Sequence, residues 1–213
     1  MFVGHYGPAA AVAGKKIKLW HGFVAVQFLD ILWAPFVLAG IEHVRIVERF
    51  TASNHFDLYY MPYTHSLVMA VFWSVLVGFA YGAWRRGGGI VIGALVFSHW
   101  LLDFIAHKSD LELWFGGPKV GLALWDNRPL AVGTEFALLI IGLGIYLTRT
   151  KAKGAMGHIA PLVLLALLAA AQIFGNFGPP PESAAAAAQS SIIAYFIFAV
   201  LAAWVDLSRS FKG

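Results

Sequence analysis

Residues 88–107 read GGIVIGALVFSHWLLDFIAH, an apolar stretch that carries ionisable side chains on one side only. A transmembrane α-helix needs roughly 20 mostly apolar residues, so this stretch predicts a helix that spans a lipid bilayer. His99, Asp103 and His107 recur at intervals of four, and residues with this spacing share one face of a helix. Because ionisable side chains inside a bilayer are expensive, this face indicates a functional site.

The composition of the whole chain supports the same class. Of its 213 residues, 60% are hydrophobic and 12% are charged, whereas soluble domains are about 45–50% apolar and about 25% charged. These values exclude a soluble cytosolic enzyme, a disordered chain and a nucleic-acid-binding domain, so we expect no nucleic-acid partner. They predict an all-α polytopic membrane bundle that forms one integral membrane domain over residues 1–213.

Six stretches are long and apolar enough to span a bilayer, at about 19–41, 64–84, 88–107, 129–148, 158–175 and 190–207. Lysine and arginine gather in every second connection, while the connection between the fifth and sixth stretches has none. This alternation predicts six spans with both termini in the cytoplasm. The basic residues concerned are Lys15, Lys16, Lys18, Arg85, Arg86, Arg149, Lys151, Lys153, Arg209 and Lys212.

The short N-terminal segment, residues 1–14, leaves two placements open. It is apolar but too short to span a bilayer. It could lie on the membrane surface, or it could re-enter the membrane from the cytoplasmic side as a half-helix that lines a buried cavity.

The connection at residues 42–63 is rich in aromatic side chains, as is the connection at residues 108–128. These rings could anchor the protein at the membrane interface, or they could cap a site beneath them. Glu42 and Arg45 are spaced as a surface ion pair on a short helical continuation of the first span.

Several ionisable side chains are predicted to lie at one depth, between the membrane midplane and the outer surface. At a rise of ~1.5 Å per residue, Asp30 lies about 18 Å and Asp103 about 22 Å from the cytoplasmic ends of their spans. His5 reaches this depth only if residues 1–14 re-enter the membrane. The set consists of His5, Asp30, His65, His99, Asp103 and Glu135.

Imidazole and carboxylate groups are the ligands that zinc, manganese and iron take when no thiolate is available, and the chain has no cysteine. The sequence therefore predicts a metal site in this layer. Asp30 or Glu135 is then the candidate to accept a proton from water, with Glu135 alternatively a hydrogen-bond partner of a ligand. Without metal, Asp30, His99 and Asp103 would form hydrogen-bonded pairs that join helices. His107, at a helix end, could be an interfacial side chain or a further metal ligand, and we expect the interfacial side chain.

Four segments within residues 1–107 resemble, in order, the YdjM-like family of bacterial inner-membrane proteins, which are described as predicted metal-dependent hydrolases. That family is in turn similar to zinc-dependent phospholipase C. The segments are Gly4-His5, Gln27-Phe28-Leu29-Asp30, Tyr63-Thr64-His65-Ser66 and Ser98-His99-Trp100-Leu101-Leu102-Asp103.

The resemblance implies a protein of the bacterial inner membrane that holds one or two zinc or manganese ions. It implies that Asp103 could bridge two ions. The ligands that it implies are His5, Asp30, His65, His99 and Asp103.

The chain departs from the family pattern in two places. The family usually has two acids in the stretch around Asp30, and this chain has one, which weakens the case for a second ion. The family usually has His-Arg-Gly before Thr-His-Ser, where this chain has residues 57–63, DLYYMPY. The missing arginine removes a clamp for a substrate phosphate.

Three functions compete at this point. The leading hypothesis is a membrane-embedded metal-dependent hydrolase that acts on a lipid or lipid-linked phosphoester through a metal-activated water. The second is a non-enzymatic subunit of a membrane complex, in which His65 and His99 ligate a haem. The third is an ion-coupled transporter that uses Asp30 and Glu135, against which the lack of internal repeats argues. Expected partners are membrane lipids and, under the second hypothesis, other subunits.

Overall fold

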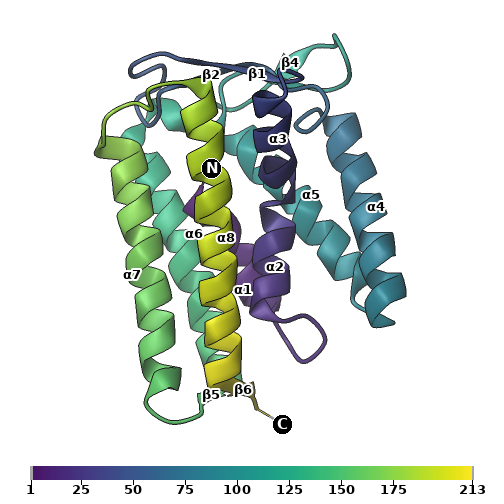
Figure 1. Cartoon of the computed structure of the whole chain (residues 1–213), viewed down its shortest axis with the longest axis vertical. Helices are drawn as coiled ribbons and strands as arrows, with labels where there is room; N and C mark the ends of the chain where they lie inside the picture. The colour runs from purple at the N-terminus through teal and green to yellow at the C-terminus, as the bar shows by residue number, and fades with distance from the viewer. Residues whose placement is uncertain (1, 213) are drawn as a thin grey trace.

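The predicted apolar stretches form the long helices of a computed structural model that describes residues 2–212 (Figure 1). By length and composition, five of the helices are able to cross a membrane, and the bent pair α2–α3 adds a sixth span. The chain is thus an all-α membrane bundle, as predicted. The long helices are α2 (Leu19–Val26) with α3 (Phe28–Leu38), α4 (Leu67–Arg85), α5 (Gly89–Ala106), α6 (Arg128–Arg149), α7 (Met156–Phe177) and α8 (Ala184–Ser208).

The outer surface of the bundle is apolar, as a lipid environment requires. Ile90 is 91% exposed, Phe79 is 77% exposed and Phe196 is 70% exposed. In water these side chains would form a large exposed apolar surface, which soluble monomers avoid. Their exposure supports a membrane protein.

The first span is broken where the sequence predicts one continuous helix. Gln27, with φ −104° and ψ 8°, separates α2 from α3, and the two helix axes differ by 48°. An interrupted helix leaves backbone groups without their usual partners, and at membrane depth these must face protein or a cavity. The carbonyl of Val26, the last residue of α2, is one such group.

The N-terminal segment is buried inside the bundle. A 3₁₀ turn, η1 (Val3–His5), leads into α1 (Tyr6–Val12), which lies behind α8 in Figure 1 and packs against α2, α5 and α6. Of the two placements left open by the sequence, the structure shows the re-entrant one. Two glycines permit it, because a Cβ at Gly142 on α6 would overlap the carbonyl oxygen of Gly7 on α1.

Short two-stranded antiparallel sheets close the two ends of the bundle. At the upper end of Figure 1, β1 (His43–Ile46) pairs with β2 (Phe56–Tyr60), and β3 (Leu111–Glu112) pairs with β4 (Lys119–Val120), followed by η2 (Leu124–Asp126). At the lower end, β5 (Thr150–Ala152) pairs with β6 (Arg209–Phe211).

The helical continuation expected after the first span is wrong. His43–Ile46 forms a strand, since its β-branched residues pair with the aromatic strand β2. Arg45 therefore forms its ion pair across the hairpin with Asp57, at 2.8 Å, and Glu42 turns into the protein interior.

Replacement of Gly142 by leucine tests the close packing of the N-terminal segment. We expect Gly142→Leu to displace α1 and to cost about 1–3 kcal/mol or more, as overpacking of a core does. The readout is the unfolding temperature of the detergent-purified protein. Gly144→Leu is the matched control, because a Cβ at Gly144 meets nothing within 4 Å. Equal unfolding temperatures for the two variants would contradict the close packing of α1 against α6 at Gly142.

Candidate metal centre

Four imidazoles surround two carboxylates in the upper half of the bundle. The side chain of Asp30 is 18% exposed, and each of the others is at most 4% exposed. They come from η1, from the first turn of α3, from the residues before α4, from α5, and from the residue that follows α5. In chain order these residues are His5, Asp30, His65, His99, Asp103 and His107. All five metal ligands predicted from the resemblance thus lie in one cluster.

One group of ligand atoms is centred on Asp30. His65 Nε2 lies 3.3 Å and His99 Nε2 lies 3.7 Å from Asp30 Oδ1. Each of the three residues offers a ligand atom within 4.8 Å of the other two. Tyr195 on α8 donates its hydroxyl to Asp30 Oδ2 at 2.8 Å, which orients the carboxylate toward the histidines.

A second group is centred on Asp103. His99 Nε2 lies 3.0 Å from Asp103 Oδ2, and His5 Nε2 lies 3.2 Å from Asp103 Oδ1. The rings of His5 and His99 stack with centroids 3.9 Å apart. Since His99 and Asp103 are one helical turn apart on α5, the helix aims both at the same space, and η1 delivers His5 from the other side.

His107 belongs to this cluster, so the expectation of an interfacial side chain is wrong. Its Nε2 atom lies 3.5 Å from Asp103 Oδ1, and its Nδ1 atom lies 2.9 Å from Asp110 Oδ1. The connection after α5 folds back over it, and the ring of Trp125 lies 4.3 Å from the His107 ring. The spacing from Asp103 indicated a shared helix face, but the sequence gave no sign of this cover.

Backbone geometry sets the tautomer of His99. Its Nδ1 atom lies 2.6 Å from the carbonyl oxygen of Val26, which can only accept a hydrogen bond. The break between α2 and α3 leaves this carbonyl available. Nδ1 of His99 therefore carries the hydrogen, so a neutral ring would present an unprotonated Nε2 to Asp30 and Asp103.

A buried acid sets the tautomer of His65 through Thr64. The Thr64 hydroxyl donates to Glu42 Oε2 at 2.7 Å, and its oxygen also lies 2.7 Å from His65 Nδ1. Because the hydroxyl has a single hydrogen, His65 Nδ1 must donate to it. Glu42 Oε1 also accepts from the backbone N–H groups of Tyr63 and Thr64, at 2.8 and 2.9 Å. Burial raises the pKa of Glu42, and these donors and His65 oppose that shift.

The hydrogen on Nδ1 of His65 and of His99 has an electrostatic consequence for the space between the rings and the carboxylates. With a hydrogen on Nδ1, the Nε2 lone pairs of His65 and His99 face carboxylate oxygens, and two acceptors at such distances repel unless a cation lies between them. If protons on the Nε2 atoms removed this repulsion, both rings would be imidazolium, and their centroids would lie 5.4 Å apart in a buried site. One divalent ion would instead balance Asp30 and Asp103 while every imidazole stayed neutral.

Glu135 lies on α6 outside both groups of ligand atoms. Its Oε2 atom accepts hydrogen bonds from the backbone N–H groups of Phe2, at 2.8 Å, and Gly4, at 3.2 Å. Glu135 thereby holds the first turn of the re-entrant segment in place. It also lines the cavity described next, so its role as a proton acceptor stays a prediction.

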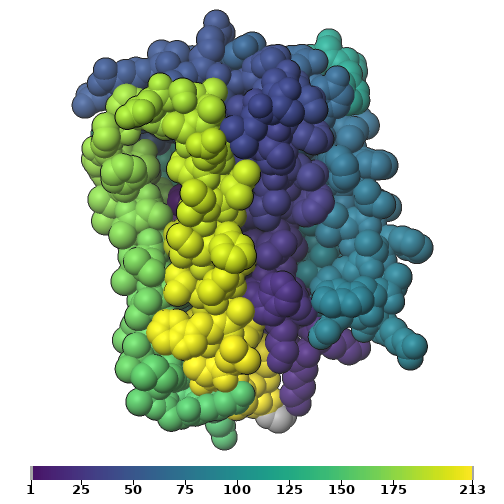
Figure 2. Space-filling view, viewed as in Figure 1, coloured from purple at the N-terminus to yellow at the C-terminus, as the bar shows by residue number. Residues whose placement is uncertain are grey.

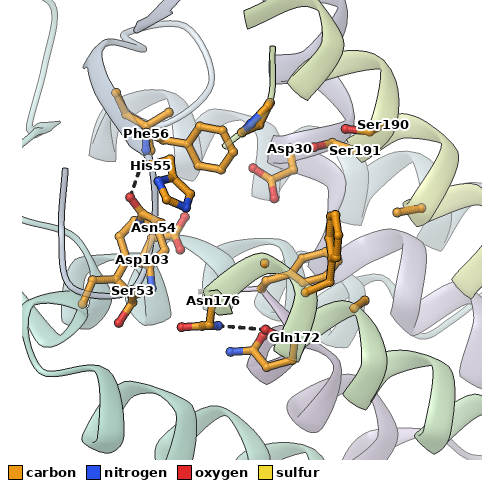
Figure 3. A pocket seen from close by; sticks show the side chains of 18 of the residues that line it. Asp30, Ser53, Asn54, His55, Phe56, Asp103, Gln172, Asn176, Ser190 and Ser191 are labelled. Carbon is orange, nitrogen blue, oxygen red and sulfur yellow. Dashed lines mark hydrogen bonds between the residues drawn. The ribbon is translucent and has the colours of Figure 1, made fainter. Parts of the chain in front are cut away.

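A cavity of about 340 Å³ opens beside the cluster. This volume lies within the range of about 300–1,000 Å³ for small-molecule sites. Asp30, Asp103 and His107 form part of its wall, and Figure 3 shows Asp30 and Asp103 facing it from different sides. In Figure 2 the surface is hollowed between α7 and α8 in the upper part of the view, where atoms of the N-terminal segment are visible. The candidate metal centre is thus accessible to a ligand.

Comparison of the chain with models of protein families, with curated proteins and with solved structures finds no match in any of the three. The resemblance to the YdjM-like family therefore stays a prediction that rests on the four sequence segments. The geometry of the cluster has to carry the functional argument.

Glu42 is the residue that sequence reasoning missed, and its replacement tests the tautomer argument. We expect Glu42→Gln to weaken metal affinity by about 10–100-fold, as loss of an outer hydrogen-bond partner does. Thr64→Val should weaken metal affinity similarly. Thr64→Ser retains the hydroxyl, so this variant should bind metal about as tightly as the unmodified protein. The measurement is metal competition against a chelator of known affinity.

Glu48→Gln is the matched control, since Glu48 is exposed in the hairpin connection. If Glu42→Gln, Thr64→Val and this control all bound metal as tightly as the unmodified protein, the relay through Thr64 would be refuted.

Proposed function

We propose that this protein is a membrane-embedded metal-dependent hydrolase that holds one or two zinc or manganese ions. The ligands are His5, Asp30, His65, His99 and Asp103. One observation carries the proposal: the Nε2 lone pairs of anchored imidazoles converge on carboxylate oxygens, at 3.0–3.7 Å for His99, beside a cavity. Zinc with neutral imidazole and carboxylate ligands is the usual composition of a catalytic site that keeps a position open for water.

The chemistry follows from the residues that border the cavity. A zinc-type ion in such a site lowers the pKa of bound water to about 7 and polarises a carbonyl or phosphoryl oxygen. Asp30 is the most exposed member of the cluster and faces the cavity, so it is placed to accept a proton from the attacking water. Tyr195 keeps this carboxylate oriented while it does so. Glu135, on the same cavity, is the alternative acceptor.

The position of the cluster suggests a lipid substrate. The connections in which most basic residues gather lie at the end of the bundle opposite to β1 and β2 (Figure 1). By the positive-inside rule, we place that end and the C-terminus in the cytoplasm, in the bacterial inner membrane that the resemblance implies. The N-terminal segment re-enters from that end, so Phe2 lies inside the bundle beside the cavity. The cluster then lies in the outer half of the bilayer, where a lipid can reach it from the side.

The alternative of a haem-binding subunit is less well supported by the geometry. A haem held by His65 and His99 would need the space between their Nε2 atoms for the porphyrin ring. Asp30 Oδ1 lies within 3.7 Å of both atoms, and Asp103 Oδ2 lies within 3.7 Å of both as well. Carboxylates in that space favour a bare metal ion.

Elemental analysis of the detergent-purified protein tests the proposal. We expect at least one equivalent of zinc or manganese and no Soret band in the optical spectrum. His99→Ala and Asp103→Ala should lose the metal and should lower turnover by more than the roughly 10–100-fold that loss of an outer partner costs. His158→Ala is the control, because His158 is exposed on α7. Folded protein that binds neither metal would refute the metal centre, and a Soret band would favour the haem-binding subunit.

A further inference from the structure

We propose that the substrate is an uncharged lipid ester, which enters between α7 and α8, and that the bond cleaved is the carboxylic ester. This inference rests on the proposed hydrolase function and names its substrate class. Three features of the cavity carry it: the place of its opening, the charge of its lining and a buried acceptor without a partner.

The cavity opens toward the acyl-chain region of a membrane. Its lining includes the last two turns of α7, at Ala171–Asn176, and the segment of α8 from Ser190 to Tyr195. At ~1.5 Å per residue, this part of α8 lies about 9–16 Å from the helix start at Ala184. Phe174, which lines the cavity on α7, is 66% exposed. An apolar chain can therefore reach the cluster laterally, without crossing the polar cap.

The lining offers a phosphoester no lysine or arginine within residues 2–212. Its carboxylate and imidazole side chains are Asp30, Asp103, Glu135, His55, His65 and His107. With the metal ion balancing Asp30 and Asp103, Glu135 is the remaining carboxylate on this wall. Arg128 and Lys108 donate to the carbonyls of Ala52 and Phe50, in the connection that covers the cavity. Proteins usually recognise phosphate with arginine, lysine or a helix N-terminus. The metal centre alone would have to compensate the negative charge of a phosphate, whereas an ester carbonyl adds no charge.

Polar groups on α7 and α8 fit the alcohol part of such an ester. Asn176 donates its amide N–H to the carbonyl oxygen of Gln172 at 2.9 Å, as Figure 3 shows. Asn176 Oδ1 is buried and has no hydrogen-bond partner. A buried acceptor without a donor is unfavourable, and a ligand hydroxyl that reached this oxygen would satisfy it. Ser190 and Ser191 lie across the same cavity.

The reaction consumes one water per ester. The water oxygen forms a bond to the acyl carbon, the bond from that carbon to the alkoxy oxygen breaks, and the alkoxy oxygen takes a proton. The products are an alcohol and a fatty acid, which releases its proton at neutral pH. No oxidant, reductant or second substrate is needed.

Two lipids that present different bonds test the substrate class. Metal-loaded full-length protein in detergent micelles is given a monoacylglycerol or a lysophosphatidylcholine, which carries one acyl ester and one phosphodiester. We expect fatty acid and glycerol from the first, at a rate at least about tenfold above that for the second. Any cleavage of the second should release fatty acid and glycerophosphocholine. Release of phosphocholine would overturn the substrate class and leave the hydrolase function standing, whereas no cleavage of either lipid by metal-loaded protein would overturn both.

Gly175 offers a test of the lateral route that leaves the metal ligands intact. It lines the cavity on α7, and a Cβ there meets nothing within 4 Å. We expect Gly175→Trp to retain its metal and unfolding temperature but to hydrolyse monoacylglycerol at least about tenfold more slowly, because misplacement of a substrate is this costly. Gly144→Trp, at an equally open position on α6, should leave the rate unchanged. Equal rates in the two variants would refute entry between α7 and α8.

Discussion

The need to compensate buried charge in an apolar medium is the constraint on which the rest of this structure depends. Asp30 and Asp103 lie inside a bundle whose exterior is lipid-like, where one charged side chain costs ~2.5–3.5 kcal/mol on insertion scales. Their oxygens are surrounded by imidazole nitrogens, and on two of these rings, His65 and His99, Nδ1 donates its hydrogen to a neighbouring oxygen. If the rings are neutral, their Nε2 lone pairs repel the carboxylate oxygens. A metal ion would remove this repulsion, because it would bond to both kinds of lone pair and cancel the carboxylate charge.

Two irregular parts of the fold position side chains of the cluster. The break at Gln27 supplies the carbonyl that anchors His99, and the re-entrant N-terminal segment brings His5 to a depth that no connection at the membrane surface could reach. Both features expose backbone polar groups within the membrane, which is tolerated only where protein or a cavity meets them. Glu135 accepts hydrogen bonds from two of these backbone N–H groups, at the start of η1. Regular helices would have been more stable locally but would have left the ligands apart.

The polar cap closes the cavity toward water, and the opening between α7 and α8 connects the cavity with the membrane. The hairpin β1–β2 and the connection around Ser53 cover the cavity from the aqueous side, and Glu42 fastens the chain just before His65. On the membrane side, α7 and α8 leave a gap lined by small and amide side chains. A site of this form restricts bulk water and admits substrates that are already dissolved in the bilayer, which is the setting the proposed hydrolysis needs.

The sequence by itself determined the all-α class, the six apolar spans and the helix face shared by His99 and Asp103, because hydropathy and helical period are local properties of the chain. Together with the four family-like segments, it also predicted the five candidate ligands, and the structure shows that these side chains lie together. Only the tertiary structure decided that residues 2–12 re-enter the bundle, that Glu42 faces inward and that His107 is covered. Each of these depends on contacts between segments far apart in the chain, such as Gly7 with Gly142 and Glu42 with Thr64, and no local pattern encodes such a contact.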